Sequence, residues 1–181
     1  MNKHGFTLAE VIVVIALMAV LSIFLVGIFF ANSRFYASQS DQIRSDQNSR
    51  TIADRMEEYG RVAVSVMATT TGYTTDSDTV VFRIPSLNGT GQVIADTYDV
   101  IVFTKDLVNA NEFKWVLSPN AASSRPAIDS TLTEKLQSVS FTYDNVNMGL
   151  VRNMNYALQI QQSGRYNSSI QLNGGITLRN K

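Results

Sequence analysis

The sequence predicts an α+β fold in which one long N-terminal helix packs on a C-terminal antiparallel β-sheet. Three observations support it: an uncharged apolar run at residues 11–31, an apolar stripe with helical spacing at residues 52–66, and short β-branched segments separated by turns beyond them. We expect four parts in the 181-residue chain: a leader at 1–5, a transmembrane helix at 6–31, an amphipathic continuation at 32–68 and a globular β-sheet domain at 69–181.

The first apolar run is long enough to cross a lipid bilayer. A helix over residues 11–31 extends about 30 Å at about 1.5 Å per residue, which matches the hydrocarbon core of a membrane. A secretory signal peptide has a shorter apolar region, about 7 to 15 residues, that ends at a small-residue cleavage site. An acid, Glu10, stands at the start of the run. Because an acid in a membrane is costly, Glu10 is predicted to have a partner and a function.

The segment from Gly5 to Glu10, Gly-Phe-Thr-Leu-Ala-Glu, resembles the processing site of type IV pilins and type II secretion pseudopilins. The resemblance implies that a prepilin peptidase cuts after Gly5 and methylates the new amino terminus on Phe6. It also implies that Glu10 pairs with the Phe6 ammonium of a neighbouring subunit, so that each buried charge offsets the penalty of the other. The alternative is a plain signal anchor in which Glu10 has no such role.

The composition argues against an enzyme and against a nucleic-acid-binding protein. The chain has no cysteine, and its single histidine, His4, lies in the predicted leader. The mature chain therefore lacks the commonest general base, nucleophile and metal ligands. Fifteen Lys and Arg residues balance fifteen Asp and Glu residues, which gives no general attraction to nucleic acid. We expect no catalytic residues, no cofactor and no metal site.

Helical structure is predicted to continue beyond the membrane to about Met67. Five apolar residues recur there at spacings of three and four: Ile52, Met56, Tyr59, Ala63 and Val66. They share one helix face and are predicted to pack on the sheet. Gly27 and Gly60 each weaken a helix by about 1 kcal/mol relative to alanine. Many major pilins carry a proline where Gly27 stands, and we expect any local melting on assembly to occur near Gly27.

The remaining segments predict strands and turns. Strands are expected at residues 79–84, 98–104, 112–117, 139–143 and 156–161, where β-branched and aromatic residues are frequent. Residues 130–136 predict a short helix with Ser130 as its N-cap. Residues 169–178 predict a hairpin that turns at Asn173 and Gly174, because Asn-Gly supplies the positive φ angles of a tight turn.

Two C-terminal runs indicate which kinds of pilin subunit the chain resembles. Residues 136–143 and 176–180 are similar to W-type minor pilins and J-type pseudopilins, which are low-copy subunits that prime or cap a fibre. The chain has no cysteine for the disulfide-closed loop of many major pilins. Glu10 also distinguishes it from the tip subunit that lacks this acid. Motility, secretion, adhesion and DNA uptake all remain open as the task of the fibre.

The resemblance implies a set of partners and a location. The partners are the prepilin peptidase, membrane lipid before assembly, a membrane assembly platform and other pilin subunits. The chain is expected to cross the cytoplasmic membrane once, with its C-terminal domain outside, and then to join an extracellular filament. The alternative is a membrane-anchored binding module, either an adhesin or a DNA receptor, that uses the same entry route.

Three further groups of residues offer binding sites, although a structural role is favoured for each. Four aspartates offer oxygen ligands for calcium: Asp76, Asp78, Asp96 and Asp99. Four residues near the C-terminus offer contacts to DNA: Arg165, Tyr166, Arg179 and Lys181. Three strand aromatics offer a sugar-stacking face: Tyr98, Phe113 and Trp115.

Overall fold

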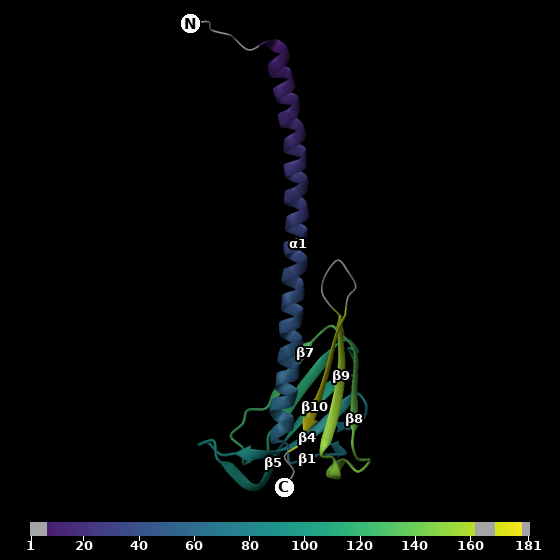
Figure 1. Ribbon diagram of the computed structural model, residues 1–181. Helices are drawn as coiled ribbons and strands as arrows, with labels where there is room; N and C mark the ends of the chain where they lie inside the picture. Colours follow the sequence, from purple (N-terminus) through teal and green to yellow (C-terminus); the bar gives the residue numbers. More distant parts are fainter. Residues whose placement is uncertain (1–6, 162–168, 179–181) are drawn as a thin grey trace. The chain divides into compact units, whose positions relative to one another are not determined.

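The computed structural model describes residues 7–161 and 169–178. The chain divides into two compact units, residues 1–41 and residues 42–181. One long helix, α1 (Leu8–Val62), begins in the first unit and ends in the second (Figure 1). All the strands of the described residues belong to the second unit and follow α1 in sequence, so the predicted α+β fold class is confirmed.

In the described residues of the second unit, the paired strands are antiparallel and form three sheets. Their bounds are β1 (Ser65–Val66), β2 (Thr69–Thr70), β3 (Tyr73–Thr74), β4 (Thr79–Leu87), β5 (Val93–Lys105), β6 (Phe113–Ser118), β7 (Ile128–Thr133), β8 (Leu136–Tyr143), β9 (Asn153–Gln161) and β10 (Ser169–Thr177). The largest sheet has the order β1-β4-β5-β6-β7, the second has the order β10-β9-β8, and β2 pairs with β3. A 3-10 turn, η1 (Met148–Leu150), precedes β9.

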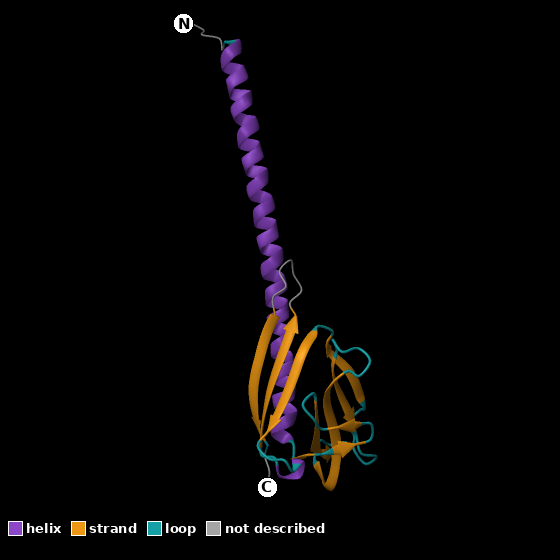
Figure 2. Cartoon of the chain, turned by 90° about the vertical axis from the view of Figure 1, so that its right-hand side faces the viewer, coloured by secondary structure: helices purple, strands orange, loops and turns teal. Residues whose placement is uncertain are grey.

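The C-terminal part of α1 packs against both of the larger sheets (Figure 2). Four residues of the predicted apolar stripe are buried, as expected: Ile52, Met56, Ala63 and Val66. The Tyr59 ring lies 5.3 Å from the Trp115 ring of β6, measured between centroids. On the other sheet, a Cβ atom added to Gly60 would lie 2.5 Å from Cγ2 of Ile176 in β10. Gly60 therefore weakens the helix but permits its close contact with β10.

The helix ends at Val62, earlier than the predicted end near Met67. Beyond this point the backbone pairs with β4, because Val64 N donates to Arg83 O at 2.8 Å and Met67 N donates to Val81 O at 2.9 Å. The β-branched valines of this segment favour an extended backbone. The predicted helical segment 32–68 is therefore too long. Of the stripe residues beyond the helix, Val66 reaches the core from β1, and Ala63 reaches it from the connection between α1 and β1.

The short helix predicted at residues 130–136 is wrong. This segment contains the end of β7 and the start of β8. In the β6–β7 pairing, Ser130 lies opposite Trp115 and Thr131 lies opposite Lys114. The capping signal of Ser130 is local, whereas the pairing with β6 is made by residues distant in sequence, and such tertiary contacts override weak helix propensity.

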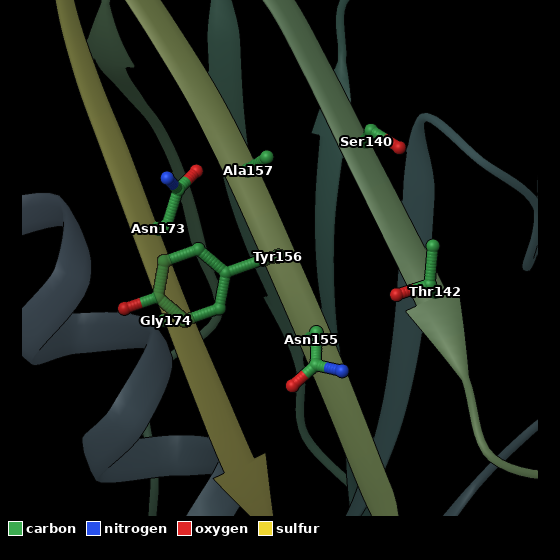
Figure 3. A pocket seen from close by; sticks show the side chains of 7 residues that line it. All are labelled: Ser140, Thr142, Asn155, Tyr156, Ala157, Asn173 and Gly174. Atoms are coloured by element: carbon green, nitrogen blue, oxygen red, sulfur yellow. The ribbon is translucent and has the colours of Figure 1, made fainter.

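The hairpin turn predicted at Asn173 and Gly174 is also wrong, because both residues lie inside β10. Gly174 is paired with Tyr156 of β9, and Figure 3 shows the Tyr156 ring lying across β10 at Gly174. A Cβ atom added to Gly174 would collide with the hydroxyl, Cζ and Cε1 of Tyr156. Gly174 thus accommodates the aromatic ring of Tyr156 in the core and does not form a turn. Tyr156 is buried, and this burial raises the pKa of its hydroxyl.

Replacing Gly174 by alanine is therefore expected to destabilise the protein. The added methyl group must displace the Tyr156 ring, and overpacking of this kind costs about 1 to 3 kcal/mol. Gly89→Ala is the matched control, since nothing lies within 4 Å of a Cβ atom at Gly89. Thermal unfolding of the full chain in detergent micelles measures both variants. Equal midpoints for the two would contradict the packing role of Gly174.

Candidate functional site

The first turn of α1 is held by reciprocal hydrogen bonds between Thr7 and Glu10. The Thr7 backbone N and its Oγ1 donate to Glu10 Oε2 at 2.8 and 3.0 Å, and the Glu10 backbone N donates to Thr7 Oγ1 at 3.3 Å. This is a capping box, in which Thr7 is the N-cap and Glu10 the third helical residue. The sequence interpretation missed the role of Thr7, although Thr-x-x-Glu before an apolar run is the usual signal for this cap.

The predicted processing site lies outside the described residues. Gly5 and Phe6 both precede Thr7, where the description begins. The charge pairing between Phe6 and Glu10 of neighbouring subunits therefore stays a prediction. Gly27 lies within α1, and nothing beyond its own helical backbone lies within 4 Å of a Cβ atom placed there. Local melting at Gly27 on assembly also stays a prediction.

The N-terminal part of α1 exposes a continuous apolar surface. In the described residues, one helical segment, Leu8–Ser40, is long and apolar enough to cross a membrane. Its large apolar side chains remain between 44% and 78% exposed, so the described residues do not cover them. An apolar surface of this size marks a site of contact with lipid or protein. The backbone is satisfied internally by the helix, so that lipid can surround it.

Several of the residues with alternative binding roles occupy structural positions. Phe113 and Trp115 are buried in the core, which confirms the favoured structural role for both and excludes them from a sugar-stacking face. Asp76 accepts a hydrogen bond from the Asp78 backbone N at 2.8 Å and thereby closes a turn. No group of three or more potential metal ligands occurs among residues 7–161 and 169–178. Of the residues that offered DNA contacts, Arg165, Tyr166, Arg179 and Lys181 all lie outside the described parts of the chain.

Asp99 of β5 is a buried carboxylate with a full set of donors. Ser86 Oγ, Asn120 N and Ser123 Oγ donate to it at 2.7, 2.9 and 2.9 Å, and Arg125 Nη1 lies 2.6 Å from Oδ2. Burial alone raises the pKa of Asp99, but these hydrogen bonds together hold the pKa below its ordinary value of 3.8. Asp99 therefore attaches the loop that follows β6 to the two strands β4 and β5.

Stability is expected to fall in acid because of Asp99. A carboxyl group whose folded-state pKa is lowered stabilises the fold fully above its unfolded-state pKa, near 3.8. The stabilisation is lost as the pH falls through the lower folded-state pKa. Asp99→Asn removes this part of the pH dependence and costs about 3 kcal/mol at neutral pH, because Arg125 loses its carboxylate.

Urea unfolding of the full chain from pH 7 to pH 3 measures both effects. Asp129→Asn, at an exposed position of β7, is the matched control for the loss of one carboxylate. An Asp99→Asn variant with the parent's stability and pH profile would refute the structural role of Asp99.

Comparison with known proteins identifies the N-terminal segment. Residues 1–26 match the family model described as the prokaryotic N-terminal methylation motif. No curated protein matches the chain. The match covers the predicted leader, the capping box and most of the apolar run, and it is consistent with the type IV pilin and pseudopilin family. The chain thus carries an N-terminal methylation motif before an apolar helix, an arrangement that is consistent with type IV pilin-like proteins.

Proposed function

We propose that this chain is a structural subunit of a type IV pilus-like filament, with the role of a minor pilin or pseudopilin. One observation carries the proposal: the methylation motif at residues 1–26 leads directly into a helix whose apolar side chains are exposed. Such a helix needs either lipid or other helices around it. A filament subunit uses the two environments in turn, first in the membrane and then in the fibre.

The proposed mechanism has four steps. A prepilin peptidase removes residues 1–5 and methylates the amine of Phe6. The N-terminal part of α1 then stays in the cytoplasmic membrane as a single span, with the β-sheet unit outside. An assembly platform extracts the helix from the membrane. In the filament, α1 bundles with the helices of other subunits, and Glu10 pairs with the Phe6 ammonium of a neighbour.

The charge pair has a defined task in this mechanism. Because lipid is as apolar as a helix surface, moving α1 from lipid into a helical bundle gains little from burial. Packing and polar contacts must therefore set the register of the subunits. The role is structural, without a catalytic step, a cofactor or nucleic acid. The similarity of residues 136–143 and 176–180 to low-copy subunits supports a minor role over a major one.

Isolation of surface fibres tests the proposal. Fibres sheared from cells and the membrane fraction are each analysed by mass spectrometry for peptides of this chain. A filament subunit is expected in the fibres with Phe6 as its N-terminus, at a small fraction of the main subunit. An anchored adhesin or DNA receptor stays with the membranes. Complete absence of this chain from fibres made by the same cells would refute the proposal.

A further inference from the structure

The second unit contains a cavity of about 390 Å³ that has no role in the proposed assembly. It lies between the segment after α1, strands β4 and β5, and the turn before β9. Six of its lining residues matter here: Val64, Ser65, Arg83, Tyr98, Leu150 and Arg152. The cavity thus brings two arginines together from segments that are distant in sequence.

Arg83 stacks on an aromatic ring but has no acidic partner in the part of the chain that the structure describes. Its Cζ atom lies 3.7 Å from the centroid of the Tyr98 ring, so that the guanidinium is held against the aromatic face. Its Nε atom is buried and has no hydrogen-bond partner among the described residues. Because Nε is closed off from water, an acceptor in the cavity cannot reach it. The two terminal nitrogens of Arg83 form no hydrogen bond among the described residues, so they are the donors that remain for a ligand in the cavity.

Arg152 supplies the second positive charge. Neither arginine forms an ion pair within the described parts of the chain. Of the acids close to this cavity in sequence, Asp144 accepts from the backbone N of Arg152 and of Asn153, at 3.1 and 2.9 Å, and Asp99 is paired with Arg125. Asp96 forms no ion pair with either arginine among the described residues. Among the described residues, neither guanidinium group is therefore paired with an acid.

We propose that this cavity binds an oxyanion, which is a carboxylate or a phosphate group. A guanidinium presents paired N–H donors whose spacing matches two oxygens of such a group, and the end-on mode uses its two terminal nitrogens. The Ser65 hydroxyl lines the same cavity and can donate as well. Val64 and Leu150 add apolar walls, which lower the local dielectric constant and strengthen the attraction. The proposal does not depend on the assembly of the chain into filaments.

Nuclear magnetic resonance of the arginine side chains tests the proposal. The full chain, labelled with ¹⁵N, is studied in detergent micelles, and the Arg Nε–H signals are followed while an anion is added at constant ionic strength. One series adds inorganic phosphate and a second adds succinate, with chloride as the reference. The Arg83 signal is assigned by its loss in Arg83→Lys. A saturable shift of this signal is expected with at least one of the two anions.

Two variants separate a specific site from general charge effects. Arg152→Gln is expected to weaken binding about tenfold, since a hydrogen bond between charged groups is lost. Arg50→Gln removes one positive charge from an exposed position on α1 and is expected to leave binding unchanged. Saturation by succinate but not phosphate identifies carboxylates as the source, and the reverse identifies phosphates. No saturable shift with either anion, or equal binding by the parent and Arg152→Gln, would overturn the proposal.

Discussion

Gly5→Leu is expected to leave the protein as an uncut, membrane-retained precursor. Gly5 is the residue before the proposed scissile bond, and a glycine there lets the peptide backbone approach the peptidase closely. A branched side chain displaces the bond from the attacking group, and a displacement of about 1 Å is enough to cost about a hundredfold in rate. The intact mass of the protein isolated from membranes then includes residues 1–5. Without cleavage the Phe6 amine does not exist, so that methylation is lost as well.

Two comparisons make the result specific to the cleavage site. Gly27→Ala alters a glycine in the same apolar helix but beyond the proposed cleavage site, and it is expected to be processed normally. Gly5→Ala adds only one methyl group and is expected to lie between the parent and Gly5→Leu. Detection of Phe6 as the N-terminus of most Gly5→Leu molecules would contradict both the cleavage position and the processing step in the proposed function.

The sequence predicts most reliably those features that depend on neighbouring residues. The apolar run at 11–31 and the stripe beginning at Ile52 are periodic within one helix, so their pattern alone predicts the helix and its buried face. The segment from Gly5 to Glu10 is likewise contiguous. The fold class and the methylation motif could therefore be predicted before the structure was known.

Features that depend on distant partners could not be predicted in the same way. Asn-Gly at 173 and 174 is a strong turn signal, but the Tyr156 ring needs the missing side chain of Gly174 within β10. The stacking of Arg83 on Tyr98 joins two strands, and nothing in either segment specifies the other. Non-local pairing also decides that residues 130–136 are extended. In each case tertiary contacts outweigh a local preference of about 1 kcal/mol or less.

The second large effect is expected at Glu10. Glu10→Val is expected to be cut after Gly5 and inserted in the membrane as usual, but to enter filaments about tenfold less often or worse. The reason is that the Phe6 ammonium of the neighbouring subunit is left without its counter-charge in an apolar bundle, which is strongly unfavourable. Sheared fibres and membranes are compared by quantitative mass spectrometry, and the N-terminal peptide reports processing in each fraction.

The capping box complicates this interpretation, because Glu10 has two separate roles that valine removes together. Its carboxylate accepts from Thr7 at the start of α1, which stabilises the helix end, and it carries the charge proposed to meet Phe6. Glu10→Gln keeps a side chain that can complete the capping box but removes the charge. Thr7→Val removes the hydroxyl of the cap but keeps the charge. The two variants thus separate the roles with small changes in shape.

The pattern of the three variants decides which role governs assembly. If the charge pair sets the register, Glu10→Gln and Glu10→Val fail alike, whereas Thr7→Val enters filaments nearly as well as the parent. If the cap is what matters, Thr7→Val fails with Glu10→Val and Glu10→Gln assembles. We expect the first pattern, because loss of one cap costs about 1 kcal/mol at a helix end that lipid or other helices also support. Without Glu10, by contrast, the Phe6 ammonium has no counter-charge, because the apolar run at residues 11–31 contains no other acid.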